Sequence, residues 1–468
     1  MKLSHSPGRT RASFDDPNLV SHGGLVPVMA LAERAGLPGL LAEHVRPGGE
    51  CGVNAPAKVG CLVAGMTAGA DSIDDMGLLR HGAMDILFGG VRAPSTLGSH
   101  LRSYTWGNVL QLERAGRELL TRLSRQAPLL PGADVLAFID IDSTQKRVYG
   151  HKKQGARFGH TKIQGKSVLV RGLNALIAAV STPLAAPVAV ATRLRGGNAP
   201  SSRGAEGLAA QAVGTARACG AAGTIAVRMD SAYYAAAVIP AVRRNGARFS
   251  VTAPVTAAIR AAIAAIPEDA WAAIAYPQAV WDDQLDCLVS DAEVAETPYT
   301  AFTSKKKELH VAARLIVRRV RDKNKGAAAG QGELFPAWRY HAVFTDSPYE
   351  LLQAEEQHRG HAIIEQLLAD LNDGPLAHLP SGKFNANAAW LSVAAIAHNL
   401  LRAAGALAGR RHARARAATV RRDLVAVAAR TARHGRTGLT LHLPAGWHRE
   451  REWRNLFEAS CGPPAAAA

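Results

Sequence analysis

Two aspartates that close an apolar strand are the residues of this sequence best suited to chemistry. Residues 135–141 are apolar and of strand length, and residues 140–144 read DIDST. Side chains alternate between the two faces of a strand, so Asp140 and Asp142 point the same way. Two carboxylates at the end of a buried strand are costly without a cation, and Mg²⁺ or Mn²⁺ would offset that cost. The alternative is that both aspartates belong to a turn that ends the strand.

A second apolar strand also ends in an acidic residue. Residues 223–229 read GTIAVRM, and Asp230 follows directly. Around these two stretches, the hydrophobic pattern predicts three strands, a helix, a strand, a helix and a fifth strand. This order predicts an α/β fold with a ribonuclease-H-like mixed sheet, in which the first and fourth strands are neighbours. Asp142 and Asp230 would then meet at adjacent strand ends.

A third carboxylate, Glu365, lies on a helix predicted over residues 348–371. A spacing of i, i+3 and i+7 places His358, His361 and Glu365 on one helix face. The same spacing is compatible with zinc, because histidines and a carboxylate on one face can bind Zn²⁺. No separate partner ligand is evident in the sequence, so we favour carboxylate chemistry.

If this helix crosses the sheet, Glu365 can join the two strand-end aspartates. Three carboxylates can hold two Mg²⁺ or Mn²⁺ ions about 3.5–4 Å apart, an arrangement that supports in-line attack at a phosphodiester. One ion would activate the attacking water or 3′-hydroxyl, and the other would stabilise the leaving oxygen. We therefore expect Asp142, Asp230 and Glu365 to be catalytic and to bind metal, with Asp140 as a further candidate ligand.

The charge of the chain indicates a polyanionic partner. Its 468 residues include 55 Lys and Arg against 38 Asp and Glu, a formal charge of +17, and its pI is ≈ 10.0. The sequence shows no long charge-free apolar run and no secretory signal, and the five cysteines are scattered without a CxxC pair. These features argue against a disulfide framework and fit a cytoplasmic protein without a membrane segment. DNA or RNA is the expected partner.

Basic residues near the acidic strand ends are candidate phosphate contacts. Residues 149–166 read YGHKKQGARFGHTKIQGK, which is rich in Gly and Lys but is not a Walker loop because GxxxxGK[ST] is absent. For each basic residue the alternative is an ordinary solvated surface. The candidates for DNA binding are Lys152, Lys153, Arg157, Lys162, Arg195, His358, Arg359, His361, Lys305, Lys306, Lys307, Arg318 and Arg319.

The chain is expected to divide into five segments. Asp230 and Glu365 are 135 positions apart, far more than a minimal connection needs. We therefore expect a separate strand-rich unit there. The segments are a helical N-terminal DNA-binding domain (1–128), the first part of the catalytic core (129–253), a β-rich insertion (254–338), the second part of the core with the Glu365 helix (339–405) and a basic C-terminal region (406–468).

Nearly the whole chain resembles the DDE transposases of bacterial insertion sequences, in the group with a strand-rich insertion before the catalytic Glu. The resemblance rests on DIDST at 140–144, LRGGNAPSSRGA at 194–205, RMDSAYY at 228–234, GARFSVTA at 246–253, TVRRDL at 419–424 and LTLHLP at 439–444. It implies that Asp142, Asp230 and Glu365 form the carboxylate triad and use two Mg²⁺ or Mn²⁺ ions. It also implies double-stranded DNA as partner, both terminal inverted repeats and target, with a homodimer in the DNA complex. The implied activity is DNA cleavage followed by strand transfer.

The helix signature of that family is Tyr-x2-Arg-x3-Glu-x6-Lys, and this chain keeps only the Glu. His358 stands for the Tyr, His361 for the Arg and Asn372 for the Lys. Both histidines can donate hydrogen bonds to a phosphate, but neither is a permanent cation at neutral pH. Two alternatives follow: a DNA-binding protein that keeps the fold without the chemistry, or a ribonuclease-H-like nuclease that cuts without joining.

Overall fold

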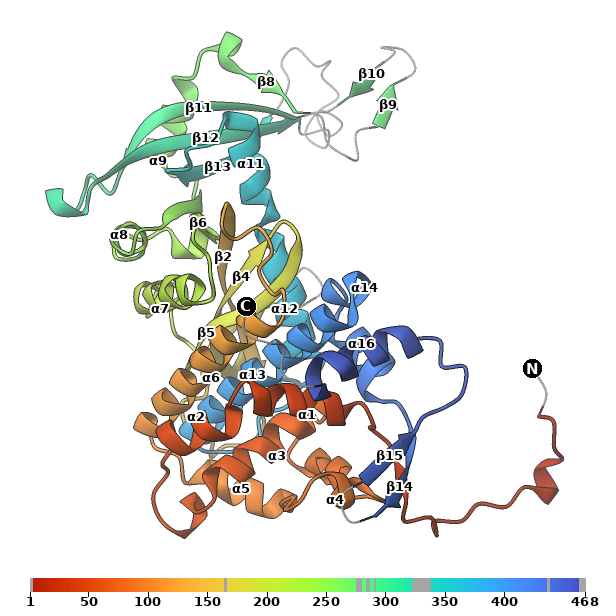
Figure 1. Ribbon diagram of the computed structural model, residues 1–468. Coiled ribbons are helices and arrows are strands. Elements are labelled where there is room, and N and C mark those ends of the chain that lie inside the picture. The colour runs from red at the N-terminus through yellow and green to blue at the C-terminus, as the bar shows by residue number, and fades with distance from the viewer. Residues whose placement is uncertain are drawn as a thin grey trace.

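One large mixed sheet forms the centre of the protein (Figure 1). The computed structural model describes residues 3–163, 166–274, 280–282, 287–289, 292–321, 338–435 and 438–462. The sheet has the order β3-β4-β2-β6-β7-β13-β12-β11-β8, and β5 also pairs with β4. Its strands are β2 (Leu136–Arg147), β3 (Arg157–Ile163), β4 (Lys166–Thr182), β5 (Ala185–Gly196), β6 (Thr224–Met229), β7 (Arg248–Ala253), β8 (Ala272–Ala273), β11 (Ala292–Ala301), β12 (Val311–Arg321) and β13 (Trp338–Thr345).

The part of the sheet that carries the acidic residues consists of β5, β4, β2, β6 and β7. β2 is antiparallel to β4 and parallel to β6, and β6 is parallel to β7. Helices α7 (Ala205–Ala218) and α8 (Val238–Arg244) connect the strands on one side, while α11 (Leu351–Arg359) and α12 (Ile363–Asn372) lie on the other (Figure 1). Strands covered on both faces should be apolar throughout, and Ile139 and Ile141 are fully buried.

The strands after β7 continue the main sheet. β13 pairs antiparallel with β7, and β12 and β11 follow in turn. This pairing satisfies the backbone groups along the outer edge of β7, which would otherwise lack partners. Our expectation of a separate unit is therefore corrected, because the hairpin of β11 and β12 extends from the same sheet as the acidic strands. A small ribbon of β9 (Val280–Asp282) and β10 (Cys287–Val289) lies between β8 and β11 in the chain.

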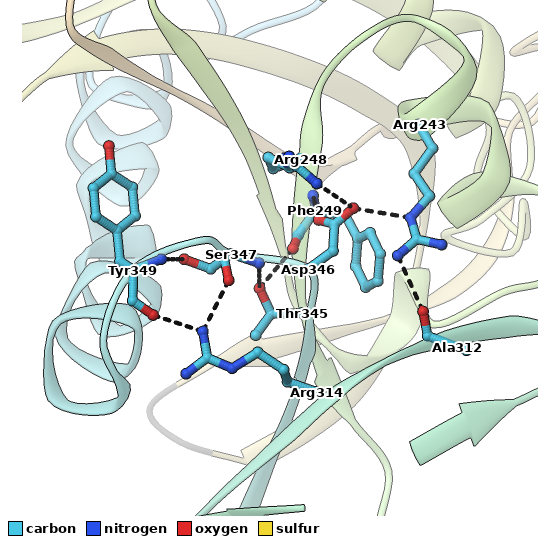
Figure 2. A network of polar contacts seen from close by, with 9 residues as sticks. All are labelled: Arg243, Arg248, Phe249, Ala312, Arg314, Thr345, Asp346, Ser347 and Tyr349. Carbon is cyan, nitrogen blue, oxygen red and sulfur yellow. Dashed lines mark hydrogen bonds and ion pairs between the residues drawn. The ribbon is translucent and has the colours of Figure 1, made fainter. Parts of the chain in front are cut away.

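A polar network ties the end of this extension to the start of α11 (Figure 2). Asp346, directly after β13, accepts hydrogen bonds from the backbone N–H of Phe249 (2.7 Å) and from Nε of Arg243 (2.9 Å). Arg314 of β12 donates to the carbonyl oxygens of Ser347 (2.8 Å) and Tyr349 (2.6 Å). These contacts fix the loop that leads into α11, and so they help to set where the following helix α12 lies.

The helical half of the molecule packs around one long apolar helix, α13 (Phe384–Ala408). α13 contacts α1, α3, α5, α6 and α16 as well as β5. In the described residues, α13 is long and apolar enough to cross a membrane, and the bent pair α1 and α2 passes the same test together. The apolar stretch of α13 is 89% buried inside the protein, as is typical of a core helix. The helices around it include α1 (Leu25–Arg34), α2 (Leu37–His44), α3 (Ala55–Ala68), α4 (Met84–Leu87), α5 (Pro94–Arg102), α6 (Trp106–Gln126) and α16 (Glu450–Cys461).

The two ends of the chain meet in this half. β1 (Leu19–Val20) pairs with β14 (Ala429–His434), which pairs with β15 (Gly438–His442). α16 packs on α1 and α13, and Figure 1 shows these N-terminal and C-terminal elements side by side. The buried side chains of the helices and of the central strands form one continuous cluster. Residues 1–128 therefore share a core with the rest of the chain. The remaining short helices are α9 (Ala257–Ala264), α14 (Arg410–Ala413) and α15 (Ala417–Val420).

Candidate active site

β2 and β6 bring two of the expected carboxylates together. Asp230 directly follows β6, but β2 continues through Asp142 to Arg147, so our expectation that Asp142 ends its strand is corrected. The register pairs Asp140 with Arg228 and Ile141 with Met229, so Asp142 and Asp230 are the next residues on the two parallel strands. Both line a pocket of about 810 Å³, and Glu365 and His361 line it as well. The structure thus places all three carboxylates around one pocket beside Asp142 of β2 and the carboxyl end of β6.

The sequence of α12 explains why Glu365 faces this pocket. Ile364, Leu367, Leu368 and Leu371 are buried, and their i, i+3, i+4 and i+7 spacing makes one apolar stripe that packs on the core. Glu365 lies outside that stripe in the first turn and is exposed. The helix is therefore held by its apolar side while it presents the carboxylate to the strand ends.

Burial of Asp142 beside two other carboxylates is the main electrostatic feature of the pocket. Burial raises the pKa of Asp142 to about 6, and the charges of Asp230 and Glu365 add to this effect. The backbone N–H of Ser143 donates to Asp142 at 2.6 Å and opposes it. Carboxylate oxygens are the ligands that Mg²⁺ prefers, and a bound cation would relieve the repulsion. Within the part of the chain that the structure describes, however, no three His, Cys, Asp or Glu side chains already form a metal site.

Asp140 has a different role from the one we expected. Its side chain is fully buried, and its two oxygens accept hydrogen bonds from Nε and Nη2 of Arg228, both at 2.7 Å. One of these oxygens is also 2.9 Å from Nδ1 of His361. Because both oxygens are engaged, the structure does not support Asp140 as a metal ligand.

Comparison with known families identifies the chain. The profile of the family described as Transposase DDE domain group 1 matches residues 5–459. The chain belongs to this family. It is a DDE transposase, and DNA is the partner that this membership implies. No curated protein matches the chain.

The helix signature of this transposase is interrupted. We predicted one helix over residues 348–371, but α11 ends at Arg359 and a 3-10 turn, η7 (Gly360–Ala362), separates it from α12. The turn alters the helical phase, so His358 and Glu365 point to different places. His358 contacts the hydroxyl groups of Ser250 (2.8 Å) and Thr252 (3.0 Å) on β7. Both ring nitrogens are engaged, and the structure therefore places His358 in the core of the transposase, away from any phosphate.

The buried ring of His358 predicts an acid-sensitive fold. Burial, with nearby positive charge, lowers the pKa of His358 to about 3, while an unfolded histidine titrates near 6.5. Below pH 6.5 the histidine is therefore protonated in the unfolded state but stays neutral in the folded state. The free energy of unfolding consequently decreases as the pH falls. Between pH 6.5 and pH 5 this group alone should lower the free energy of unfolding by about 1.6 kcal/mol. Urea unfolding of His358→Gln should show a shallower loss over that range. A similar change of the exposed His378 should leave the loss as in wild type.

Four arginines that we predicted to contact DNA instead interact with groups of the protein itself. Arg195 donates to the backbone carbonyls of Pro200 (3.2 Å) and Ser201 (2.8 Å), and so it holds a loop at the rim of the pocket. Arg319 is buried between Glu268 and Glu293 and lies over the rings of Trp271 and Trp338. Arg318 and Arg359 both pair with Glu355, at 3.3 and 2.8 Å. The structure supports a positioning role for these four residues.

The lysine candidates are more accessible. Lys152, Arg157 and Lys305 to Lys307 are exposed, and Lys153 is half-buried. The three adjacent lysines lie in the turn between β11 and β12. The side chain of Lys162 lies outside the described residues, although its backbone belongs to β3.

Two residues that the sequence analysis missed contribute to the site. Arg228 neutralises Asp140. The sequence contains a signal for this pairing, because Arg228 precedes Asp230 by two positions, as Asp140 precedes Asp142. Lys146 of β2 donates from Nζ to the side-chain oxygen of Asn372 at 2.8 Å. Burial lowers the pKa of Lys146 to about 8. This transposase therefore has a lysine amine from β2 next to the position where the signature would supply one from α12.

Proposed function

We propose that this transposase binds the ends of an insertion sequence, cleaves the DNA there and joins it to a target, with Asp142, Asp230 and Glu365 as its carboxylate triad. One observation carries the proposal: a carboxylate within β2, one directly after the parallel strand β6 and one on a helix 135 residues beyond Asp230 line a single pocket. The strand order β5-β4-β2-β6-β7, with β2, β6 and β7 parallel, supports a ribonuclease-H-like core.

The donor set of the pocket fits Mg²⁺ or Mn²⁺. The three carboxylates would hold the metal. Burial chiefly raises the pKa of Asp142, and the negative charges of Asp230 and Glu365 add to it, so a bound cation would stabilise the ionised carboxylates. Two such ions, when bound, supply activation of the attacking oxygen and stabilisation of the leaving oxygen. The chain itself contributes orientation. The N–H of Ser143 fixes one oxygen of Asp142, and Arg195 holds the rim of the pocket at Pro200 and Ser201.

The function is tested with a DNA fragment that carries the terminal sequence of the element next to flanking DNA. With Mg²⁺ present, the purified protein should cut at the junction and join the cut end to a plasmid. Binding without any cutting would favour the degenerate DNA-binding alternative instead. Cutting without joining would favour a nuclease. Cross-linking on a terminal fragment should give a homodimer, which we propose as the state on DNA.

Lys305, Lys306 and Lys307, in the turn between β11 and β12, should bind DNA phosphates. Each phosphate contact contributes about 0.9 to the slope of log affinity against log salt for duplex DNA. Replacing Lys305, Lys306 and Lys307 by Gln should therefore lower that slope by about 2 to 3 and weaken binding at low salt. A filter-binding salt series measures this effect.

A control with the same loss of charge uses exposed arginines at the opposite end of the molecule. Arg433 on β14 and Arg451 and Arg454 on α16 provide it. If the lysine variant keeps the wild-type salt slope and affinity, the turn is a solvated surface. If both variants lose the same amount, the effect is one of net charge and not of this turn.

A further inference from the structure

We propose that His361 is a further catalytic residue, whose Nε2 accepts the proton of the attacking water or 3′-hydroxyl, and that Asp140 and Arg228 hold its ring for this purpose. The inference rests on the proposed function. It gives His361 a role at the reacting oxygen in place of a contact to a phosphate.

The contact to Asp140 determines which ring nitrogen carries the proton. A guanidinium can only donate hydrogen bonds, and that of Arg228 donates to both oxygens of the buried Asp140 at 2.7 Å, so Asp140 accepts at both oxygens. An ionised carboxylate can only accept hydrogen bonds. At 2.9 Å from Asp140, Nδ1 of His361 must therefore be the protonated nitrogen. In the neutral ring, Nε2 is then an acceptor.

The free nitrogen belongs to a side chain that lines the carboxylate pocket. His361 lines it together with Asp142, Asp230 and Glu365. Among the described residues, Asp140 is the one hydrogen-bond partner of the ring, and it uses Nδ1. Since Nδ1 is turned to the sheet, Nε2 on the other edge of the ring is available to a molecule in the pocket.

The turn that carries His361 is fixed by the same arginine. Nη1 of Arg228 donates to the carbonyl oxygen of Gln357 at 2.6 Å, and the guanidinium lies 4.0 Å from the ring centre of Phe138. A Cβ at position 360 would come within 2.7 Å of that Nη1, so Gly360 permits the close approach. One buried side chain thus orients Asp140 and anchors the turn beside His361.

The proposed step is balanced within the pocket. The attacking O–H gives its proton to Nε2 while its oxygen forms a bond to phosphorus and the bond from phosphorus to the 3′ oxygen breaks. The leaving oxygen takes a proton from water, and Asp140 faces the positive charge that develops on the ring. In strand transfer the 3′-hydroxyl is the attacking group, and the same acceptor serves. General-base assistance of this kind contributes about 10²- to 10⁴-fold.

His361→Asn separates this role from a structural one. The amide nitrogen of Asn can replace Nδ1 as donor to Asp140, but no atom replaces Nε2. Cleavage should fall by about 10²- to 10⁴-fold, while affinity for the DNA end without metal should remain within about twofold. Added imidazole should restore part of the cleavage by His361→Ala. His378, which pairs with Asp71 at 3.1 Å on the surface, provides the control variant His378→Asn.

A second measurement does not depend on activity. Nitrogen-15 spectra of ring-labelled histidine, assigned by the loss of one signal in His361→Asn, should show the Nδ1–H tautomer at pH 8. An Nε2–H tautomer, or wild-type cleavage by His361→Asn, would overturn the inference. A loss of DNA affinity in that variant would instead make His361 a phosphate contact. If the wild-type protein neither binds nor cuts terminal DNA, the proposed function is wrong. The tautomer measurement then still tests whether Asp140 orients the ring of His361.

Discussion

Each of the variants Asp142→Asn, Asp230→Asn and Glu365→Gln is expected to lose about 10³-fold or more in DNA cleavage, because the ions at such a site supply several kcal/mol of charge stabilisation. The amides keep the size of the side chains, so the fold should remain. Without metal, affinity for the DNA end should be unchanged or higher, since each variant removes a negative charge from a pocket that must accept phosphate. Gel assays of cleavage and metal-free binding measure both effects.

Matched controls are available next to the same elements. Asp134, just before β2, and Glu356 on α11 are exposed and do not line the pocket. Asp134→Asn and Glu356→Gln should cleave at the wild-type rate. Thermal unfolding adds a readout without DNA: Mg²⁺ should stabilise the wild-type protein and should have a smaller effect on the three pocket variants. Wild-type cleavage by any one of the three would remove that residue from the triad.

Arg228→Met is expected to destabilise the protein by about 3–5 kcal/mol, the usual result of leaving one partner of a buried ion pair uncompensated. Asp140 has no exposure to water, so its charge cannot be solvated once the guanidinium is gone. The carbonyl of Gln357 loses a donor as well. Chemical unfolding monitored by tryptophan fluorescence measures the loss.

The double variant Arg228→Met with Asp140→Leu tests the cause. It removes both charges and should recover most of the lost stability, although His361 then lacks its acceptor. Arg430→Met, which breaks an exposed pair with Asp16 at 3.2 Å, should cost no more than about 1 kcal/mol. If the single Arg228 variant costs as little as that, the buried pair does not hold the site together.

Local sequence signals predicted the end of β6 well because such signals depend on nearby residues, but they placed the end of the first strand at Asp142, whereas β2 continues to Arg147. Asp142 lies within β2 and Asp230 directly follows β6, and the parallel pairing of these two strands aligns them. The same alignment shows that Asp140 must face Arg228, since both precede their aspartates by two positions. That inference was available, and it would have separated the buried aspartate from the one in the pocket.

Other features depend on partners that are distant in the sequence. Arg319 resembles a surface cation until β8, β11 and β12 bring Glu268 and Glu293 to it. The prediction that His358, His361 and Glu365 share one helix face was wrong because η7 interrupts the helix. The close approach of Arg228 to Gly360 has no signal in the nearby sequence. The pairing of β13 with β7 was also not predictable, because a strand pattern does not specify which edge it joins.

The position of α13 in the chain has a consequence for biosynthesis. The helices of residues 25–126 are made first, yet the helix around which they pack spans Phe384–Ala408. The ribosome therefore releases the whole sheet before the helical half can bury its apolar surface, and these contacts are among the slowest kind to form. A chain cut short by a frameshift before residue 384 would expose that surface and be prone to aggregation. Gene copies with such a frameshift should thus yield insoluble fragments. These fragments should not compete with the full-length protein for the DNA ends.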